Sequence, residues 1–576
     1  MRILLVHPTS FAGNDISHPR VEQLGLAYLA AVARRDGFEV QIEDYNIPKT
    51  STPDAARHLV TIAGTYDLVG FSVLGTSYPQ AKALVEALRG TGFRGHITMG
   101  GYFPTFLANS VFDDLPEIDS ILTGEAETTF PQLLHRLAGG DDWRTVPGLA
   151  FRDGAQVIQN APPPLIPNLD TLPFPARDTL ATLLRYHNPV ISVSPSRGCW
   201  ATCNFCSIIE FYGRQEGRPM RERSPSNIVD EIEEVMARPE VRLRHVDFVW
   251  FCADEFLGLR KEGRRFGVRF AEEVLRRQVV FRWEMACRAD QVEFENFRLL
   301  REAGLRSVYL GVESFSDRQL ASYQKRTTAD RNRSALDTLK RLRIDYTMGT
   351  IVFSKDTTLE EFEENHRTIK EYGYRHVTMP LSRLKLFEGT PATEQQRIKH
   401  DAVRIDYGHT AAVADDWFPL DDVFGYEFDD PRVLDLWDAL RMRGERNDEL
   451  VREVIALLDD RLLDGVAFWK LTFAIRDTLA GRVDDAIVAV RSSAEPERVR
   501  QQHERELGAA VRQVADFRQW LLTEPEPEEI FRFRINGEEI VYKVPIGKPI
   551  CLPGAEKDVA EREYLARTDD QPLMLP

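Results

Sequence analysis

The chain is organised around residues 196–206, Ser-Arg-Gly-Cys-Trp-Ala-Thr-Cys-Asn-Phe-Cys, which hold three cysteines close together. Three residues separate Cys199 from Cys203, and two separate Cys203 from Cys206. One short loop can therefore present three thiolates to a metal centre. A [4Fe–4S] cluster takes four cysteine ligands. Three from one loop, with no fourth at a matching distance, predict a cluster with one iron left open for another ligand.

Two plainer interpretations of these cysteines stay open at this point. A structural zinc site is closed and tetrahedral, and is usually built from two ligand pairs. The remaining cysteines, Cys252, Cys287 and Cys551, are isolated, and no histidine lies at ligand spacing near the loop. The three thiols could also be ordinary core residues. The spacing favours the cluster over zinc and over unliganded thiols.

Length and composition restrict the class of protein. A chain of 576 residues is too long for one core, so we expect three domains. The net charge of −17 argues against a nucleic-acid partner, because phosphate binding needs a basic surface. No apolar run is long enough for a membrane partner or span, and residues 1–8 indicate a strand rather than a signal peptide. Six cysteines, three of them clustered, favour a reducing compartment, so we expect a cytoplasmic protein.

Short apolar runs alternate with helical patterns over residues 1–147, which is typical of a parallel sheet covered by helices. Strands are expected at 2–6, 40–45, 68–73, 96–99 and 120–123, and helices at 25–36, 55–63, 79–88 and 131–137. The pattern predicts an α/β, doubly wound, Rossmann-like domain. Such a domain binds its ligand at the carboxyl ends of the strands.

Three loops at those strand ends carry candidate binding residues. They are Ser72, Thr76 and Ser77 after the third strand, Gly100, Gly101 and Tyr102 after the fourth, and Gly124 and Glu125 after the fifth. Glycines let the backbone approach a flat ligand or a phosphate closely, although each alone is often a plain turn. There is no GxGxxG, so a nicotinamide or flavin site is not favoured.

A proline-rich segment follows this domain. The prolines between residues 162 and 175 exclude a regular helix or a central strand. Before them, residues 148–158 predict a β-hairpin around Asp153-Gly154. We assign residues 148–184 to a hairpin and a packed strap, because a free linker would expose the leucines that the segment contains.

Residues 185–395 again alternate strand and helix patterns. Strands are expected at 189–194, 245–251, 281–286, 307–312, 346–352 and 376–381, and helices at 226–236, 264–276, 293–303, 317–324, 332–342 and 358–372. About six such units predict a partial (β/α)6 barrel. Chemistry in these barrels sits at the carboxyl ends of the strands, and the cysteine loop directly follows the first of them.

The pattern changes over residues 396–576 to charged amphipathic helices, expected at 431–443, 447–458, 465–480, 483–492 and 496–522. Alternation over residues 531–542 around Asn536-Gly537 predicts a β-hairpin. We expect a mostly helical domain that caps the barrel and shapes the substrate pocket. A partner-docking surface is the alternative.

The cysteine motif, with Phe205 before its last cysteine, resembles that of the radical S-adenosylmethionine (SAM) superfamily. Blocks after the later strands agree with this resemblance: Asp254-Glu255-Phe256, Cys287-Arg288-Ala289-Asp290, Gly311-Val312-Glu313-Ser314, residues 349–358 and Gly389-Thr390-Pro391. The loops of the first domain, with GG-x-x-P and GE-x-E, resemble the B12-binding domain found ahead of some radical enzymes. No Asp-x-His-x-x-Gly is present to supply an axial imidazole. Over residues 1–395 the chain thus resembles the cobalamin-dependent radical SAM enzymes.

This resemblance implies three cofactors: a [4Fe–4S] cluster on Cys199, Cys203 and Cys206, SAM, and cobalamin. It implies a methyltransferase that passes a methyl group from SAM through methylcobalamin to a carbon of a small-molecule or peptide-derived substrate. A 5′-deoxyadenosyl radical would first remove a hydrogen, with electrons from an external flavodoxin or ferredoxin type donor. A non-methylating cyclisation, ring contraction or oxidation stays open, as does a non-catalytic corrinoid-binding protein.

The other candidate residues each have a structural alternative. Glu313 could accept hydrogen bonds from SAM or form a salt bridge, and Arg288 could pair with a carboxylate of a ligand or of the protein. Asp254 and Glu255 could line the cavity or bond to the next loop. We assign Phe205 to the cofactor site through the motif, and give Ser354 and Arg383 less weight. We expect Cys252, Cys287, Trp200 and Trp250 to be packing residues.

Overall fold

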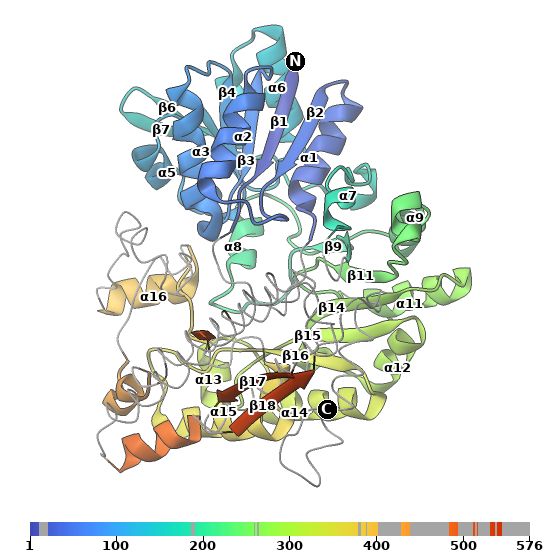
Figure 1. The fold of residues 1–576 in the computed structure, drawn as a ribbon, viewed down its shortest axis with the longest axis vertical. Coiled ribbons are helices and arrows are strands. Elements are labelled where there is room, and N and C mark those ends of the chain that lie inside the picture. Colours follow the sequence, from blue (N-terminus) through green and yellow to red (C-terminus); the bar gives the residue numbers. More distant parts are fainter. Residues whose placement is uncertain are drawn as a thin grey trace.

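The computed structural model describes residues 1–10, 21–185, 190–258, 260–261, 264–377, 382–387, 389–400, 428–437, 440, 483–492, 511–512, 515, 530–535 and 538–543. Figure 1 shows an N-terminal α/β domain above a second sheet with its helices, and α8 (Ser207–Gly213) lies between the two. Among the described residues, no helix combines the length and the apolar character that crossing a membrane requires.

The N-terminal domain contains the predicted parallel sheet. Its strands are β1 (Arg2–His7), β2 (Glu39–Asp44), β3 (Leu68–Ser72), β4 (His96–Gly100) and β5 (Ser120–Leu122), in the order β2-β1-β3-β4-β5. The predicted hairpin, β6 (Leu149–Asp153) and β7 (Gln156–Gln159), extends this sheet through antiparallel pairing of β6 with β5. The sheet therefore has seven strands where the sequence indicated five.

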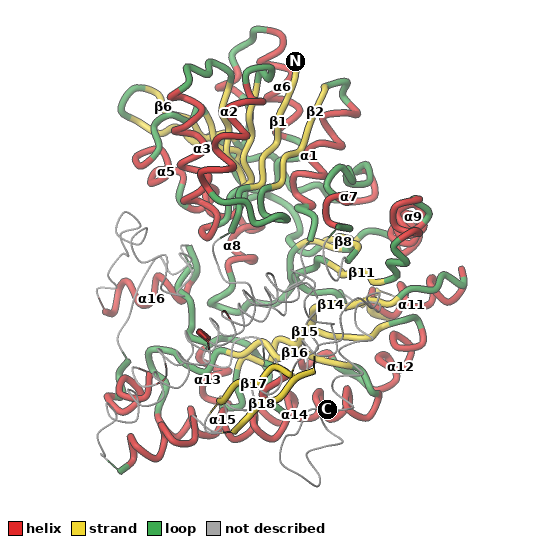
Figure 2. Tube along the Cα trace, in the orientation of Figure 1, coloured by secondary structure: helices red, strands yellow, loops and turns green. Residues whose placement is uncertain are grey.

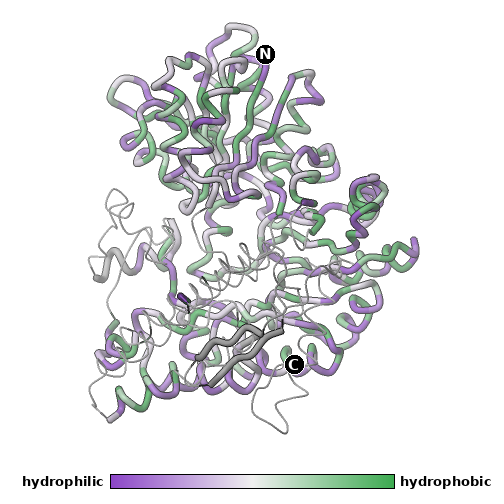
Figure 3. Tube along the Cα trace, in the orientation of Figure 1, coloured by the Kyte–Doolittle hydropathy of each residue, from purple (hydrophilic) through white to green (hydrophobic). Residues whose placement is uncertain are grey.

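Alternate residues of the central strands face two separate cores. Ile3 and Leu5 pack with α1 (Leu24–Arg35) and α6 (Thr129–Gly139), while Leu4 and Val6 face α2 (Thr52–Ala63) and α3 (Tyr78–Gly90). Both sides of β1 are buried, as expected for a strand inside a doubly wound sheet. In Figure 3 hydrophobic stretches follow these strands.

Several short helices escaped sequence analysis. They are α4 (Tyr102–Phe106), α5 (Ala108–Asp114), α7 (Leu180–Leu183), α8 and α10 (Pro239–Leu243), and none exceeds two turns. A period of 3.6 residues needs a longer window to be recognised. The ten-residue α16 (Pro391–His400) was also missed, because its sequence has no clear apolar face.

The second sheet is parallel and has the order β16-β15-β14-β11-β8. Its strands are β8 (Ile191–Val193), β11 (Phe248–Phe251), β14 (Arg282–Arg288), β15 (Leu305–Glu313) and β16 (Asp345–Thr350). Val377, within the range expected for the sixth strand, forms a single parallel bridge with Met348 of β16, and Arg383, just after that range, forms one with Phe353. Residues 378–381 of that prediction lie outside the described residues.

Helices follow these strands as predicted for a partial barrel. They are α9 (Pro225–Met236), α11 (Phe266–Arg277), α12 (Phe294–Glu302), α13 (Asp317–Ser322), α14 (Ala329–Leu342) and α15 (Leu359–Tyr372). The short strand pairs β9 (Ser196–Arg197) with β10 (Arg221–Glu222), and β12 (Arg260–Lys261) with β13 (Arg264–Arg265), are antiparallel. Figure 2 shows loops gathered where the two parts of the molecule face each other.

The proline-rich strap is packed, as predicted. Leu165 and Leu169 are buried, and the Leu165 N–H donates to the Glu216 carbonyl at 2.8 Å. In the last third, residues 431–437 and 483–491 are helical, and β17 (Ile530–Ile535) pairs with β18 (Glu538–Lys543) as the predicted hairpin. The helices expected at 447–458 and 465–480, and nearly all of 496–522, fall outside the described residues.

Candidate active site

The cysteine loop leaves the second sheet through a tightly fixed turn. Gly198 has a φ of +74°, and a Cβ there would lie 2.2 Å from the Pro219 carbonyl oxygen, so only glycine fits. The Gly198 N–H donates to Oδ2 of Asp254 at 2.9 Å. Asp254 follows β11, so the neighbouring strand fixes the start of the loop.

The three thiols lie in a partly buried environment. Cys203 is buried, and Cys199 and Cys206 are half-buried. Burial raises the pKa of the Cys199 thiol to about 11 and that of Cys206 to about 12. Bound metal deprotonates a coordinating thiol, and Nη1 of Arg288 lies 3.5 Å from the Cys203 sulfur, within hydrogen-bonding distance. This donor set fits a metal–sulfur centre.

Within the part of the chain that the structure describes, no group of three His, Cys, Asp or Glu side chains converges on one point. A [4Fe–4S] cube binds each thiolate at a different iron, so its ligands need not converge.

Asn204, between the second and third cysteines, ties the loop to the barrel. Its N–H donates to the Tyr323 carbonyl at 3.2 Å, and its amide Nδ2 donates to the Ser322 carbonyl at 2.8 Å. Its own carbonyl accepts from the Ala392 N–H at 3.0 Å. The Phe205 ring packs edge-on against Tyr323, with ring centroids 5.9 Å apart.

Arg288 and Glu313 are both engaged in ion pairs. Arg288 pairs with Asp290 at 2.9 Å, donates to the Lys325 carbonyl and lies over the Trp200 ring. Glu313 Oε1 lies 2.7 Å from Lys325 Nζ. Both residues therefore form the ion pairs within the protein that were considered as the alternative to ligand binding. Glu313 Oε2 has no partner among the residues that the structure describes.

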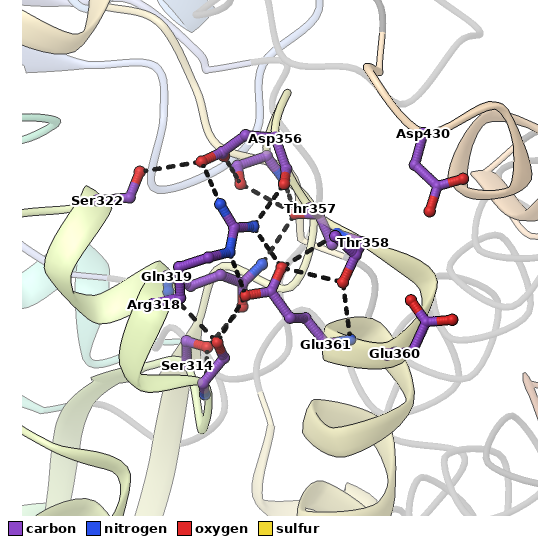
Figure 4. A network of polar contacts seen from close by, with 12 residues as sticks. Ser314, Arg318, Gln319, Ser322, Asp356, Thr357, Thr358, Glu360, Glu361 and Asp430 are labelled. Carbon is purple, nitrogen blue, oxygen red and sulfur yellow. Dashed lines mark hydrogen bonds and ion pairs between the residues drawn. The ribbon is translucent and has the colours of Figure 1, made fainter.

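A polar network fixes the loops after β15 and β16 (Figure 4). Ser314 Oγ donates to Gln319 at 2.6 Å, and Gln319 Nε2 donates to Thr357 at 2.8 Å. Glu361 accepts a hydrogen bond from Arg318 Nε at 2.6 Å. It also forms a capping box with Thr358 at the N-terminus of α15. Glu313, which directly precedes Ser314 in the chain, has a φ of +63° that a non-glycine residue rarely adopts. Ser354 belongs to the network through Asp356 and Thr357.

A cavity of about 630 Å³ lies between the carboxyl ends of the two sheets. From the N-terminal domain it is lined by the predicted residues Ser72, Gly100, Gly101, Tyr102, Gly124 and Glu125. From the barrel side it is lined by residues that include Ser194, Arg197 and Asp254. The cavity therefore reaches the start of the cysteine loop.

Thr76 and Ser77, also predicted for this site, do not line the cavity. They lie in the single turn Gly75–Ser77, where Ser77 Oγ accepts from the Leu74 N–H at 3.0 Å and Thr76 bonds with Ser10. Both side chains are buried, because the loop turns inward after Ser72. Leu74 takes their place on the cavity wall.

The two glycines after β4 differ in what they require. Gly101 has a φ of +105°, and a Cβ there would lie 2.6 Å from the Val73 carbonyl oxygen. At Gly100 the nearest atom to a Cβ would be 3.5 Å away, which is ordinary contact. Gly101 is therefore the position that lets the chain turn beside the cavity.

Glu125 lines the cavity, but its carboxylate is occupied by protein groups. Its two oxygens pair with Arg221 at 2.7 and 2.8 Å and with Arg197 at 3.0 Å, and its N–H donates to Gln215. Burial raises the pKa of Glu125, but the two guanidinium groups outweigh it and hold the pKa below its ordinary value. Glu125 thus binds the cysteine-loop side of the barrel.

Sequence reasoning missed part of the cavity wall. Trp250 and Cys252, expected to be packing residues, line it, and so do the aromatic residues Tyr28, Phe211 and Tyr212. Trp250 and Cys252 lie at the carboxyl end of β11, and active-site residues are expected at the strand ends of such a barrel. Their position in the chain could therefore have identified them as cavity residues. Asp254 and Glu255 were each expected either to line the cavity or to bond to the next loop. Asp254 lines the cavity, and Glu255 accepts hydrogen bonds from the Leu257 and Gly258 N–H groups in the next loop.

Comparison with known families agrees with this architecture. Residues 17–134 match the model of the B12 binding domain, and residues 193–369 match that of the radical SAM superfamily. The chain belongs to the cobalamin-dependent radical SAM enzymes. Its cofactors are those of the two domains: cobalamin, SAM and a [4Fe–4S] cluster.

Relatives of this enzyme carry out different reactions. The chain is 29% identical over 371 residues to the hopanoid C-3 methylase of Methylococcus capsulatus, covering 63% of this chain and 67% of the relative. It is 26% identical over 432 residues to the anaerobic magnesium-protoporphyrin IX monomethyl ester cyclase of a Synechocystis species, covering 72% and 82%.

Among solved structures, the cobalamin-dependent SAM radical enzyme OxsB, with aqua-cobalamin and SAM bound, has a TM-score of 0.69. The match covers 91% of this chain and 82% of OxsB, at 18% identity, and shows a shared fold.

Proposed function

We propose that this enzyme is a methyltransferase that moves a methyl group from SAM, by way of cobalamin, to a carbon of a small-molecule or peptide-derived substrate. The observation that carries the proposal is the shared cavity, whose walls come from the B12-binding loops on one side and from Arg197 and Asp254, beside the cysteine loop, on the other. Radical formation and methyl delivery at one substrate need sites that open into a common space.

In this proposal Cys199, Cys203 and Cys206 hold the cluster and leave one iron open. When bound, the cluster and SAM supply a carbon-based radical, and cobalamin supplies the methyl group. The protein places these groups and excludes water. Arg288 supports the thiolate of Cys203, and the bonds of Asn204 hold the loop against the barrel.

The chain offers a partner for SAM at the end of β15. Glu313 Oε2 accepts no hydrogen bond from any residue that the structure describes, and it lies next to an ion pair that already fixes the side chain. We assign it the role of accepting hydrogen bonds from SAM, while Arg288, whose donors are directed to protein atoms, acts on the cysteine loop. We keep Phe205 as a residue that shapes this site through its packing on Tyr323.

The B12-binding side holds its ligand mainly by shape. Ser72, Gly100, Gly101, Tyr102 and Gly124 contribute a hydroxyl, bare backbone and an aromatic ring to the cavity. No Asp-x-His-x-x-Gly motif supplies a histidine to the cobalt. We propose an external flavodoxin or ferredoxin type donor for the electron and a cytoplasmic location, because a reducing compartment protects the thiols.

Product analysis tests methyl transfer against the alternative. The purified enzyme, reconstituted without oxygen, is incubated with SAM, a reductant and candidate substrates. Methyl transfer gives equal amounts of S-adenosylhomocysteine and 5′-deoxyadenosine, with a gain of one methyl group in the product. The cyclase relative motivates a non-methylating reaction, for which 5′-deoxyadenosine forms without S-adenosylhomocysteine. The second outcome would replace the proposal.

A further inference from the structure

Four charged side chains join the B12-binding domain to the cysteine loop. They are Glu125 and Glu127 after β5, Arg197 in β9 and Arg221 in β10, and we name this group the interdomain clamp. Besides the bonds of Glu125, Arg197 Nη2 lies 2.5 Å from Glu127 Oε1. Two carboxylates therefore meet two guanidinium groups, and the formal charges balance.

The clamp is buried, so each charged side chain in it depends on its partners to balance its charge. The exposed fraction of the four side chains lies between 3% and 12%. Tyr28 and Tyr212 cover the guanidinium groups of Arg197 and Arg221 at 5.1 and 5.3 Å from the ring centroids. Removing one member leaves a charge without its partner in a place that water hardly reaches, which is costly.

The position of the clamp connects the two cofactor sites. Glu125 follows Gly124 on the cavity wall, and Arg197 stands two residues before Cys199. The two arginines lie opposite each other in the β9–β10 pair. A displacement of the loop after β5 is therefore passed directly to the backbone that begins the cysteine loop.

A second ion-pair group holds the domains together elsewhere. Arg177 of the strap pairs with Glu22 at 2.6 Å and with Glu231 of α9 at 2.5 Å, and Arg223 also pairs with Glu231. None of these residues belongs to the loops after β5 or to the cysteine motif. The domains thus stay attached when the clamp is weakened. The clamp therefore acts on the loop after β5 and on the cysteine loop, and is not needed to hold the domains together.

We propose that the interdomain clamp is a positioning device that sets the separation and mutual orientation of the cobalamin and the iron–sulfur cluster. Its acidic half is the GE-x-E motif, which thereby acts on the barrel and not on the corrinoid. This inference rests on the proposed binding of both cofactors. It does not depend on whether the final reaction is a methylation.

The first experiment measures local protection in the protein without cofactors, in Arg197→Lys and Glu127→Gln variants. Hydrogen exchange is followed in peptides that cover residues 124–127 and 198–206. We expect exchange in both segments to rise together by about tenfold in each variant, because each loop loses its fixed partner. A rise confined to the loop that carries the substitution would overturn the proposal.

The second experiment uses the reconstituted enzyme and needs no substrate. The reduced cluster and cob(II)alamin are both paramagnetic, so the cluster speeds the electron-spin relaxation of the cobalt when the two are close. We expect both variants to retain iron and cobalamin and to lose part of this enhancement. Relaxation equal to that of the parent protein would refute the clamp as a positioning device.

Arg282→Gln is the matched control for both experiments. Arg282 pairs with Asp247 at 2.7 Å and lies at the start of β14, the end away from Arg288 and the cysteine loop. It is expected to leave exchange in both segments and the relaxation unchanged. If the parent protein itself binds no cobalamin or no cluster, the proposed function fails, and that outcome differs from a clamp variant that behaves like the parent.

Discussion

The two edges that face the cavity are built in opposite ways. The B12-binding edge presents glycine backbone, hydroxyl groups such as that of Ser72, and aromatic or aliphatic side chains, and its carboxylates there, Glu125 and Glu127, are directed to arginines. The barrel edge presents Asp254, Arg197 and the thiol of Cys252, and Arg288 and the Glu313–Lys325 pair lie further into the barrel, with Arg288 beside Cys203.

Under the proposed function, this difference assigns the two kinds of cofactor to different edges. A large, flat ligand is held where the backbone approaches it closely, so its binding depends on the shape of the edge. A small, charged metal centre is held by coordination and by the electrostatic potential around it. Substitutions on the two edges should therefore affect different cofactors.

Removing a thiol should have the largest effect, confined to the barrel edge. Cys203→Ala is expected to lower the iron content from about four per chain to near zero, because a cluster with two remaining ligands in one loop is not retained. Cobalamin binding should persist. Iron analysis and absorption spectra check this, with Cys287→Ala, a buried thiol outside the loop, as the control. Retained iron in the Cys203 variant would contradict the assignment.

Gly101→Ala should give the complementary result. The added Cβ meets the Val73 carbonyl oxygen and forces a left-handed φ on an L-residue, so cobalamin affinity should fall by about tenfold or more. The cluster should be unaffected. Gly100→Ala, next in the chain but without the clash, is the control. Equal losses in both variants, measured by titration with cobalamin, would show that shape at Gly101 is not what matters.

Arg288→Gln should change the redox properties of the barrel edge without removing the cluster. The guanidinium near Cys203 stabilises the more negative, reduced cluster, so its removal should shift the midpoint potential to more negative values, on the order of tens of millivolts. A potentiometric titration followed by electron paramagnetic resonance measures this. Arg282→Gln, which breaks a comparable Asp247 pair at the other end of β14, should leave the potential unchanged. An unshifted potential in the Arg288 variant would contradict the assigned role.

Acid should weaken the N-terminal domain at a point far from either edge. Burial lowers the pKa of His96, at the start of β4, to about 4, against an ordinary value of 6.5. Between these values the unfolded chain binds more protons, so the free energy of unfolding should fall by up to about 3 kcal/mol as the pH drops from 6.5 towards 4. Urea unfolding at several pH values tests this in the His96→Gln variant, which should lose that dependence. The exposed His135, changed to Gln, should keep it.

Periodicity and strand-end position predicted much of this molecule. The parallel strands of both sheets, their long helices and the cysteine loop follow from patterns that extend over one element, such as the alternation of Ile3, Leu4, Leu5 and Val6 between two cores. The loops that line the cavity followed from the rule that places ligands at the carboxyl ends of strands.

What the sequence did not reveal depends on pairs of residues far apart in the chain. Nothing local to Glu125 indicates that Arg221 takes its carboxylate, or that Thr76 and Ser77 turn away from the cavity while Leu74 faces it. Likewise Trp250 and Cys252 are residue types that are common in protein cores. They line the cavity only because the other domain packs against this end of the barrel. Such partners are set by tertiary packing, which periodicity does not encode.

The strap has a consequence for protein engineering. Arg177 pairs with Glu22 of one domain and with Glu231 of the other, so the connecting segment is itself part of the contact between the domains. A chimera that grafts a foreign B12-binding domain onto this barrel would have to transplant the connecting segment with it. The recombination point with the smallest disruption therefore lies beyond the strap, near the start of β8, and not at the prolines.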